Sequence, residues 1–138
     1  MGALSTFTES VKTELATHNQ KSAYHTVTLT WAVTTADPPD TANWIPEVGG
    51  FALWIMTTPT GTPTDNYDIS AVEPEGTIDV FDSLLADRDT SNTEKVYLKP
   101  TDAVWPVFIR KNQTYVFTIS NNSQNSSGGT VVLLLLES

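Results

Sequence analysis

Cysteine is absent from this 138-residue chain, which excludes a disulfide framework, a thiolate metal site and a cysteine nucleophile. Basic residues are scarce as well: 7 lysines and arginines stand against 16 aspartates and glutamates, which gives a formal charge of −9. This balance repels the phosphate backbone of nucleic acids, and the sequence has no basic stripe that could overcome the repulsion. We therefore expect no nucleic-acid partner.

Long apolar runs are also missing. The longest, Val131–Leu136, is far shorter than the ~20 residues that a membrane-spanning helix needs. The first residues lack both the basic region and the apolar stretch of a signal peptide. The sequence therefore predicts a chain that is made in a cytoplasm and has no membrane partner.

Motifs of catalysis and cofactor binding are lacking too. The chain has no P-loop, no dinucleotide-binding glycine pattern, no nucleophile elbow and no paired-histidine zinc motif. Its two histidines are His18 and His25, and one imidazole without partners makes no active site. His25 shares a predicted strand face with Val27, so we expect it to be packed or hydrogen-bonded. The sequence thus predicts a protein that is not an enzyme and holds no cofactor.

One amphipathic segment stands at the start of the chain. Residues 5–19 carry apolar side chains at spacings of three and four, and Thr6 with Glu9 fits a capping box, so the pattern predicts a short helix. A single narrow apolar stripe is too thin for a core of its own. We expect residues 1–21 to dock on the body, to reach out as an arm to a partner, or to be a frayed terminus. The candidate partner-binding residues of this stripe are Leu4, Phe7, Val11 and Leu15.

From residue 22 onward the pattern changes to β-strands. Residues 24–35 alternate between apolar side chains and threonine, which is typical of a half-buried strand, and Phe51–Thr58 is a second strong strand. Weaker strand signals separated by turns follow at 66–72, 77–81, 95–99 and 104–110, and residues 82–89 could form one helical turn. We expect residues 22–138 to form an all-β domain, an antiparallel β-sandwich of immunoglobulin-like or jelly-roll-like type with 7–8 strands.

The chain ends in two further strand patterns. Thr114–Ser120 alternates, and Val131–Leu136 is apolar on both faces, as expected of a strand that is covered on both sides. The segment between them is rich in Asn, Ser and Gly and favours a turn. The sequence predicts a closing β-hairpin whose second strand lies deep in the fold or at a contact with another chain.

Acidic residues cluster in pairs within the turn-rich segments. Carboxylates and backbone carbonyls in such loops can bind calcium, but no EF-hand spacing occurs, and scattered surface carboxylates are usual in an acidic protein. A carboxylate pair for hydrolysis is a further alternative that needs a cleft. We commit to no metal ligand. The acidic residues concerned are Asp65, Asp68, Asp79, Asp82, Asp87 and Asp89.

Trp44 and Ile45 lie in a segment that we expect to be a proline- and glycine-rich loop between strands. A large apolar pair in a loop is harder to bury than one in a strand. These two residues are therefore candidate partner-binding anchors. The alternative is a loop that folds back over one end of the sandwich.

The second half of the chain carries a resemblance to a known group of proteins. Its segments are 64–69 (TDNYDI), 76–81 (GTIDVF), 84–88 (LLADR), 118–121 (TISN) and 128–133 (GGTVVL). This pattern, from about Phe51 to the end of the chain, resembles small β-sandwich virion proteins of tailed bacteriophages, of the capsid decoration or cement type.

The resemblance implies a non-enzymatic role on the outer capsid surface, where such a protein stabilises the head. It implies synthesis in the host cytoplasm, the major capsid protein as partner, and a homo-oligomer, with a trimer favoured. It provides no catalytic residues. The alternative is a carbohydrate- or receptor-binding β-sandwich of a phage tail, with Trp44 and Tyr67 as stacking platforms.

Overall fold

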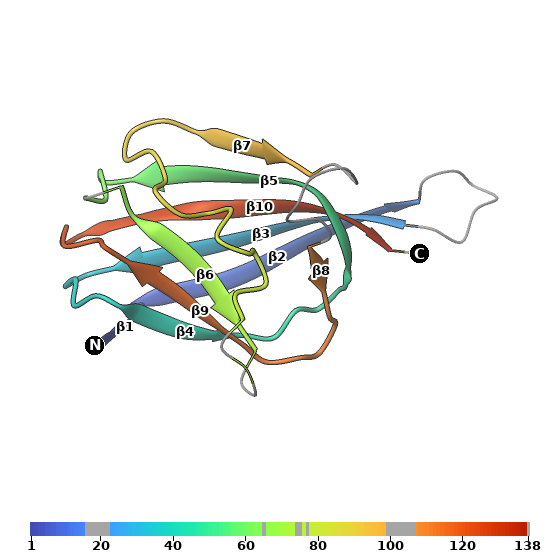
Figure 1. The fold of residues 1–138 in the computed structure, drawn as a ribbon, viewed down its shortest axis with the longest axis horizontal. Coiled ribbons are helices and arrows are strands. Elements are labelled where there is room, and N and C mark those ends of the chain that lie inside the picture. Colours follow the sequence, from blue (N-terminus) through green and yellow to red (C-terminus); the bar gives the residue numbers. More distant parts are fainter. Residues whose placement is uncertain (16–22, 65, 74–75, 77, 99–106, 138) are drawn as a thin grey trace.

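A computed structural model describes residues 1–15, 23–64, 66–73, 76, 78–98 and 107–137 of the chain. These residues form ten β-strands in two sheets that pack face to face, so the expected β-sandwich is confirmed (Figure 1). The described part contains no helix with the length and hydropathy needed to cross a lipid bilayer.

The smaller sheet has four strands in the order β1-β4-β9-β6. They are β1 (Gly2–Ala3), β4 (Asp40–Trp44), β9 (Tyr115–Ser120) and β6 (Asp68–Val72). The larger sheet has the order β2-β3-β10-β5-β7, with β8 paired to the start of β5. Its strands are β2 (Thr6–Leu15), β3 (Ala23–Val33), β10 (Ser127–Glu137), β5 (Gly50–Thr60), β7 (Glu94–Tyr97) and β8 (Phe108–Ile109). Every pair of neighbouring strands is antiparallel except β1 and β4.

The core lies between the two sheets and follows from the period-two alternation of the strands. In β3, β9 and residues 127–135 of β10 the odd-numbered residues point inward and are buried, while the even-numbered residues of β3 and β9 point outward and are mostly partly exposed. Aromatic rings fill the space between the sheets: Trp31 lies against Tyr67, and Trp44 against Tyr115. Burial of this continuous apolar cluster is the main stabilising term of the fold.

The predicted N-terminal helix is wrong. Residues 6–15 form strand β2, which pairs with β3 along its whole length. The spacing of four between Phe7, Val11 and Leu15 fits one face of a strand as well as one face of a helix, because four is a multiple of two. Pairing with β3 decides between the two, and the first fifteen residues are part of the sandwich rather than a separate arm.

The predicted closing hairpin is also wrong. Both strands exist, but β9 belongs to the four-stranded sheet and β10 to the larger one, so residues 121–126 cross between the sheets. The central position of β10, between β3 and β5, agrees with the interpretation of Val131–Leu136 as an inner strand of the fold. Its outer face, however, is only partly buried.

Three further expectations, for segments between the strong strands, are corrected. Asp40–Trp44 was expected to be loop and forms β4, which pairs with β9. The expected strand at 77–81 is reduced, within its described residues, to one bridge between Val72 and Asp79, and residues 80–87 form turns rather than a helical turn. Asp82, Ser83 and Asp87 have positive φ values, which a helix does not allow. These turns cover the free edge of β6 through hydrogen bonds from Ile69 N to Leu85 O and from Arg88 N to Tyr67 O.

Candidate functional site

The N-terminal candidate residues are placed by β1, β2 and the residues between them. Leu4, Phe7 and Val11 are partly buried and pack against the core, and the Phe7 ring lies 4.7 Å from that of Phe117. Leu15, at the end of β2, is 62% exposed. Of this stripe, Leu15 is the residue whose side chain is available to a partner in the described conformation.

Trp44 and Ile45 have opposite environments. Trp44 is 1% exposed, and its indole N–H donates to Glu9 Oε2 at 2.7 Å, so it cannot be a surface anchor. The other carboxylate oxygen of Glu9 accepts from the backbone N–H of Glu47 at 3.0 Å. Glu9 of the larger sheet thereby ties down the end of β4 in the smaller one. Ile45 is 57% exposed and remains a candidate contact residue.

The stacking platforms of the carbohydrate-binding alternative are not formed. Tyr67 is fully buried, and burial raises its pKa to about 12, with the nearby Arg88 guanidinium opposing the shift. Since Trp44 is buried too, neither ring can stack on a sugar. The sequence assigned Trp44 to a loop, where exposure is usual, and Tyr67 to the start of a strand, but the packing of the two sheets encloses both rings.

The acidic residues of the turns mostly accept backbone hydrogen bonds. Asp79 accepts from the N–H groups of Ala71, Phe81 and Ser83 at 2.9–3.1 Å. Asp68 accepts from Asp87 N and Asn121 Nδ2. These carboxylates organise the turns beside β6, and neither of these two needs a cation to satisfy its oxygens.

Asp89 behaves in the same way. The backbone N–H groups of Ser91 and Asn92 donate to it, and these hydrogen bonds lower the pKa of the carboxyl. Among the described residues, no three histidine or acidic side chains gather as a group that could hold a metal ion. Asp65, one of the candidate calcium ligands, lies outside the described residues.

A chain of polar groups connects β2, β3 and β10 near one end of the larger sheet. The imidazole of His25, which is 3% exposed, contacts Thr13 Oγ1 through Nδ1 at 2.8 Å and Glu137 Oε2 through Nε2 at 2.5 Å. Donation from Nε2–H to the carboxylate leaves Nδ1 of a neutral ring to accept the Thr13 hydroxyl proton. The hydrogen bonds agree with the expectation of a packed or hydrogen-bonded His25, but the ring is buried rather than at the surface. Its partner Glu137 is 112 residues away, and no sequence spacing signals the contact.

A hydroxyl, an imidazole and a carboxylate in this order also occur in acyl-transfer enzymes. Such chemistry needs a substrate beside the hydroxyl, and the pocket next to Glu137 does not include Thr13 in its lining. Because the three side chains come from three neighbouring strands, we assign them a structural role: they connect the strand ends at this edge of the molecule.

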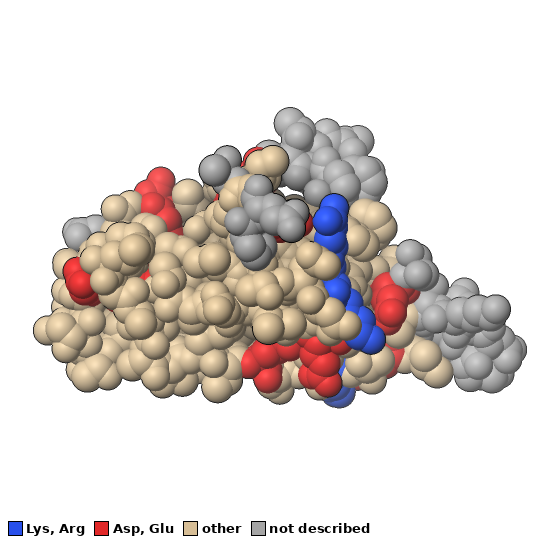
Figure 2. All heavy atoms as spheres, turned by 90° about the horizontal axis from the view of Figure 1, so that it is seen from below, with Lys and Arg blue, Asp and Glu red and all other residues tan. Residues whose placement is uncertain are grey.

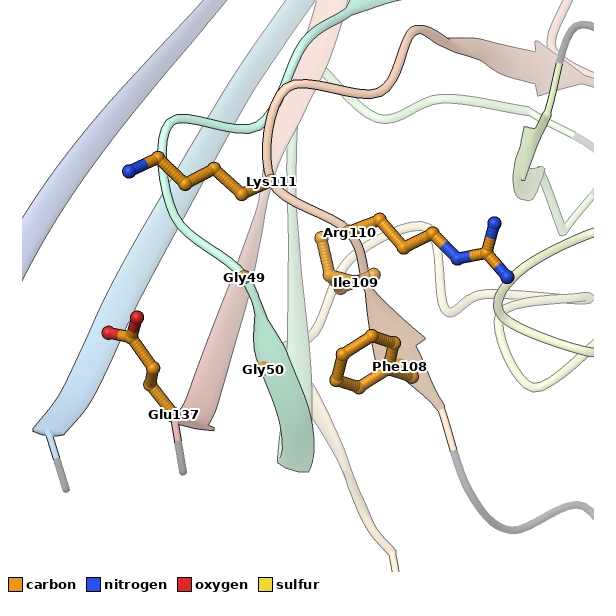
Figure 3. A pocket seen from close by; sticks show the side chains of 7 residues that line it. All are labelled: Gly49, Gly50, Phe108, Ile109, Arg110, Lys111 and Glu137. Carbon is orange, nitrogen blue, oxygen red and sulfur yellow. The ribbon is translucent and has the colours of Figure 1, made fainter.

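That pocket has a volume of about 320 Å³ and lies where β8 meets the start of β5. Gly49 lines it and has no room for a side chain, since a Cβ there would lie 2.7 Å from the carbonyl oxygen of Ile109. Figure 3 shows that the side chains of Arg110 and Lys111 leave the end of β8 in opposite directions. The two cations therefore do not converge on one bound group. The full lining is Gly49, Gly50, Phe108, Ile109, Arg110, Lys111 and Glu137.

Charge is unevenly spread over the surface. On the face seen in Figure 2 the basic side chains gather in one band, whereas acidic side chains lie at several separate places. With a formal charge of −9, the molecule as a whole repels others of its kind except where a surface is free of acidic groups.

Comparison with protein-family models, with curated proteins and with solved structures finds no match to this chain. The geometry described above defines a β-sandwich with candidate contact surfaces.

Proposed function

We propose that the protein is a non-enzymatic structural protein of a bacteriophage virion, one that binds the outer surface of the capsid and stabilises the head. The proposal starts from the resemblance of residues 51–138 to decoration and cement proteins. Its partner is the major capsid protein, and its place is the capsid surface.

The geometry of the larger sheet supports this role. In Figure 1 the ends of β2, β3 and β10 extend past the four-stranded sheet as a three-stranded ribbon. Leu15 stands at the end of the described part of β2 and is 62% exposed. An apolar side chain on a projecting ribbon can enter a hollow between neighbouring subunits, and this is the observation that carries the proposal.

The body behind this ribbon is well suited to bridging. The N-terminus is held in the sandwich, because β1 pairs with β4 and the terminal amine lies 3.2 Å from Asp37. Glu9 connects the two sheets through Trp44 and Glu47. A rigid body transmits force between the subunits that it contacts, which is how a cement protein stabilises a shell.

Co-sedimentation with empty capsids of the same virion tests the proposal. We expect the protein to pellet with capsids and the Leu15→Asp variant to lose most of this binding, because the charge must be buried on contact. Ile78→Asp is the matched control. Ile78 is 76% exposed and lies in the loop beside β6, at the edge of the four-stranded sheet, so its substitution should leave binding unchanged. A protein that stays in the supernatant, and binds tails or glycans instead, would refute the capsid role.

A further inference from the structure

The larger sheet has an outer face that no described strand covers. The four-stranded sheet packs on its inner face only (Figure 1). On the outer face the central strand β10 carries Val132, Leu134 and Leu136, all partly exposed. Antiparallel sheets that face water normally carry polar side chains at such positions. The apolar character of β10 on both faces therefore has no explanation within the described part of the chain.

Neighbouring strands continue this apolar surface. The strand register places Met56 beside Val132 and Trp54 beside Leu134 on one side of β10, and Tyr24 beside Leu136 on the other. These six residues, which we call the outer apolar patch, are Tyr24, Trp54, Met56, Val132, Leu134 and Leu136. Next to Trp54 on β7 lies Tyr97, which is 61% exposed.

The patch is the apolar centre of a larger face. With strands about 4.8 Å apart and successive residues of one face about 6.8 Å apart, its six residues together with Tyr97 cover about 230 Å². Contiguous apolar patches on a monomer are often functional surfaces. The next row along the same face contains only threonine: Thr8, Thr30, Thr130 and Thr58. An apolar centre beside a polar margin is the usual composition of a protein–protein contact.

The charges of this face favour a second copy of the chain as the occupant. The charged residues on its described strands are Lys12, Glu14 and Lys95, so the face has no net negative charge although the molecule has −9. Two copies can therefore approach through these faces without the repulsion that the rest of the surface causes. Lys95 lies over the Trp54 ring at 4.3 Å, so this cation borders the patch.

The order of the strands adds a second reason. The most apolar strand, β10, is the middle one of β2-β3-β10-β5-β7. A two-fold axis along β10 places β10 over its own copy and lays the edge strand β2 over β7 of the other molecule. Ser10 of one copy then lies over Lys95 of the other, because both stand level with Val132, so Lys95 does not face a like charge at this margin. The whole face, about 24 by 36 Å from five strands of up to eleven residues, matches the ~800 Å² that each partner buries in an interface of standard size.

We propose that the outer apolar patch is the contact between two copies of this chain, which pack sheet on sheet about a two-fold axis along β10. Two such sheets would lie about 10 Å apart, and because the axis runs along β10, the two copies of this strand would be parallel. The inference does not depend on the capsid role, and it replaces the trimer suggested by the resemblance with a two-fold pair.

Sedimentation velocity of the full chain at several concentrations tests the proposal. We expect a particle of twice the 15.1-kDa chain for the wild type, and loss of this dimer in Leu134→Lys, with the sandwich preserved in the circular dichroism spectrum. Thr118→Lys is the matched control, since Thr118 lies on the outer face of β9, in the middle of the smaller sheet, and its substitution should leave the dimer intact. Trp54→Thr serves as a second patch variant that keeps a residue favoured in strands.

Three results would overturn the proposal. The first is a wild-type mass of one chain or of three. The second is a dimer that survives Leu134→Lys and Trp54→Thr, because the contact then uses another surface. The third is a monomer whose binding to capsids is lost in Leu134→Lys but kept in Leu15→Asp, because the occupant of the patch is then the capsid.

Discussion

The orientation of β10 can be tested with two substitutions at adjacent positions. Leu133 is fully buried and lies between Val27 of β3 and Ile55 of β5, both of which are also buried. Leu134 is the next residue, points to the outer face and is partly exposed. The variants Leu133→Ala and Leu134→Ala remove the same atoms from opposite faces of one strand, so strand propensity and backbone effects are matched.

The two variants should lose several-fold different amounts of unfolding free energy. Truncation of a fully buried leucine costs about 2–5 kcal/mol of unfolding free energy, and the upper half applies where the neighbours cannot collapse into the cavity. Leu133 is such a case, because paired strands on both sides hold its neighbours in place; we expect about 3–4 kcal/mol. For Leu134 we expect about 1 kcal/mol, because only part of its surface leaves water in the monomer.

Urea unfolding followed by circular dichroism measures both values. The protein should be kept at low concentration, since a second copy bound to the outer face would add stability to the wild type. For a domain of this size the loss at Leu133 corresponds to a fall of about 10–15 °C in melting temperature. If Leu134→Ala destabilises the dilute protein as much as Leu133→Ala does, β10 does not have the two faces described, and the reasoning is refuted.

Two further predictions concern polar groups inside the sandwich. Glu9→Ala should lower the unfolding free energy by about 2–3 kcal/mol, because the Trp44 indole and the Glu47 amide lose a charged acceptor. Glu14→Ala, on the solvent side of the same strand, should lower it by less than about 1 kcal/mol in the same urea assay. Equal losses in the two variants would contradict a sheet-bridging role of Glu9. Tyr67 should ionise only near pH 12 in an ultraviolet absorbance titration, and because the folded state holds this proton more tightly than the unfolded chain, stability should fall between about pH 10 and pH 12. Tyr67→Phe should remove that part of the pH dependence, and a Tyr67 that ionises near pH 10 would show that its ring is not enclosed.

The two sheets also explain which features of the candidate site could not be foreseen. Glu9 and Trp44 are 35 residues apart, and Thr13, His25 and Glu137 span almost the whole chain. Such contacts depend on which strand lies beside which, and nothing local to any of these residues encodes that order. The partners of the turn carboxylates could not be foreseen either. The residues around Asp79 are typical of a turn, but only the fold shows that Asp79 accepts hydrogen bonds from backbone groups of β6 and of its own turn.

The sequence alone determined the composition, the charge and those strands whose alternation is strong. Alternation in residues 24–35 and 114–120 predicted β3 and β9 within about two residues, because period two is a local property of a strand with one buried face. The sequence also predicted the all-β class and the inner position of Val131–Leu136 from composition and pattern alone.

Tertiary structure decided the rest. A spacing of four fits both a helix and a strand, so the N-terminal stripe of Phe7, Val11 and Leu15 became β2 only because β3 offers it a partner edge. The turn between β9 and β10 is compatible with a hairpin, yet the two strands join different sheets, since each finds its buried face on opposite sides of the core. The uncovered apolar face of β10 is likewise a property of the assembled sheet, because only the strand order reveals that Tyr24, Trp54 and Leu134 lie on one surface.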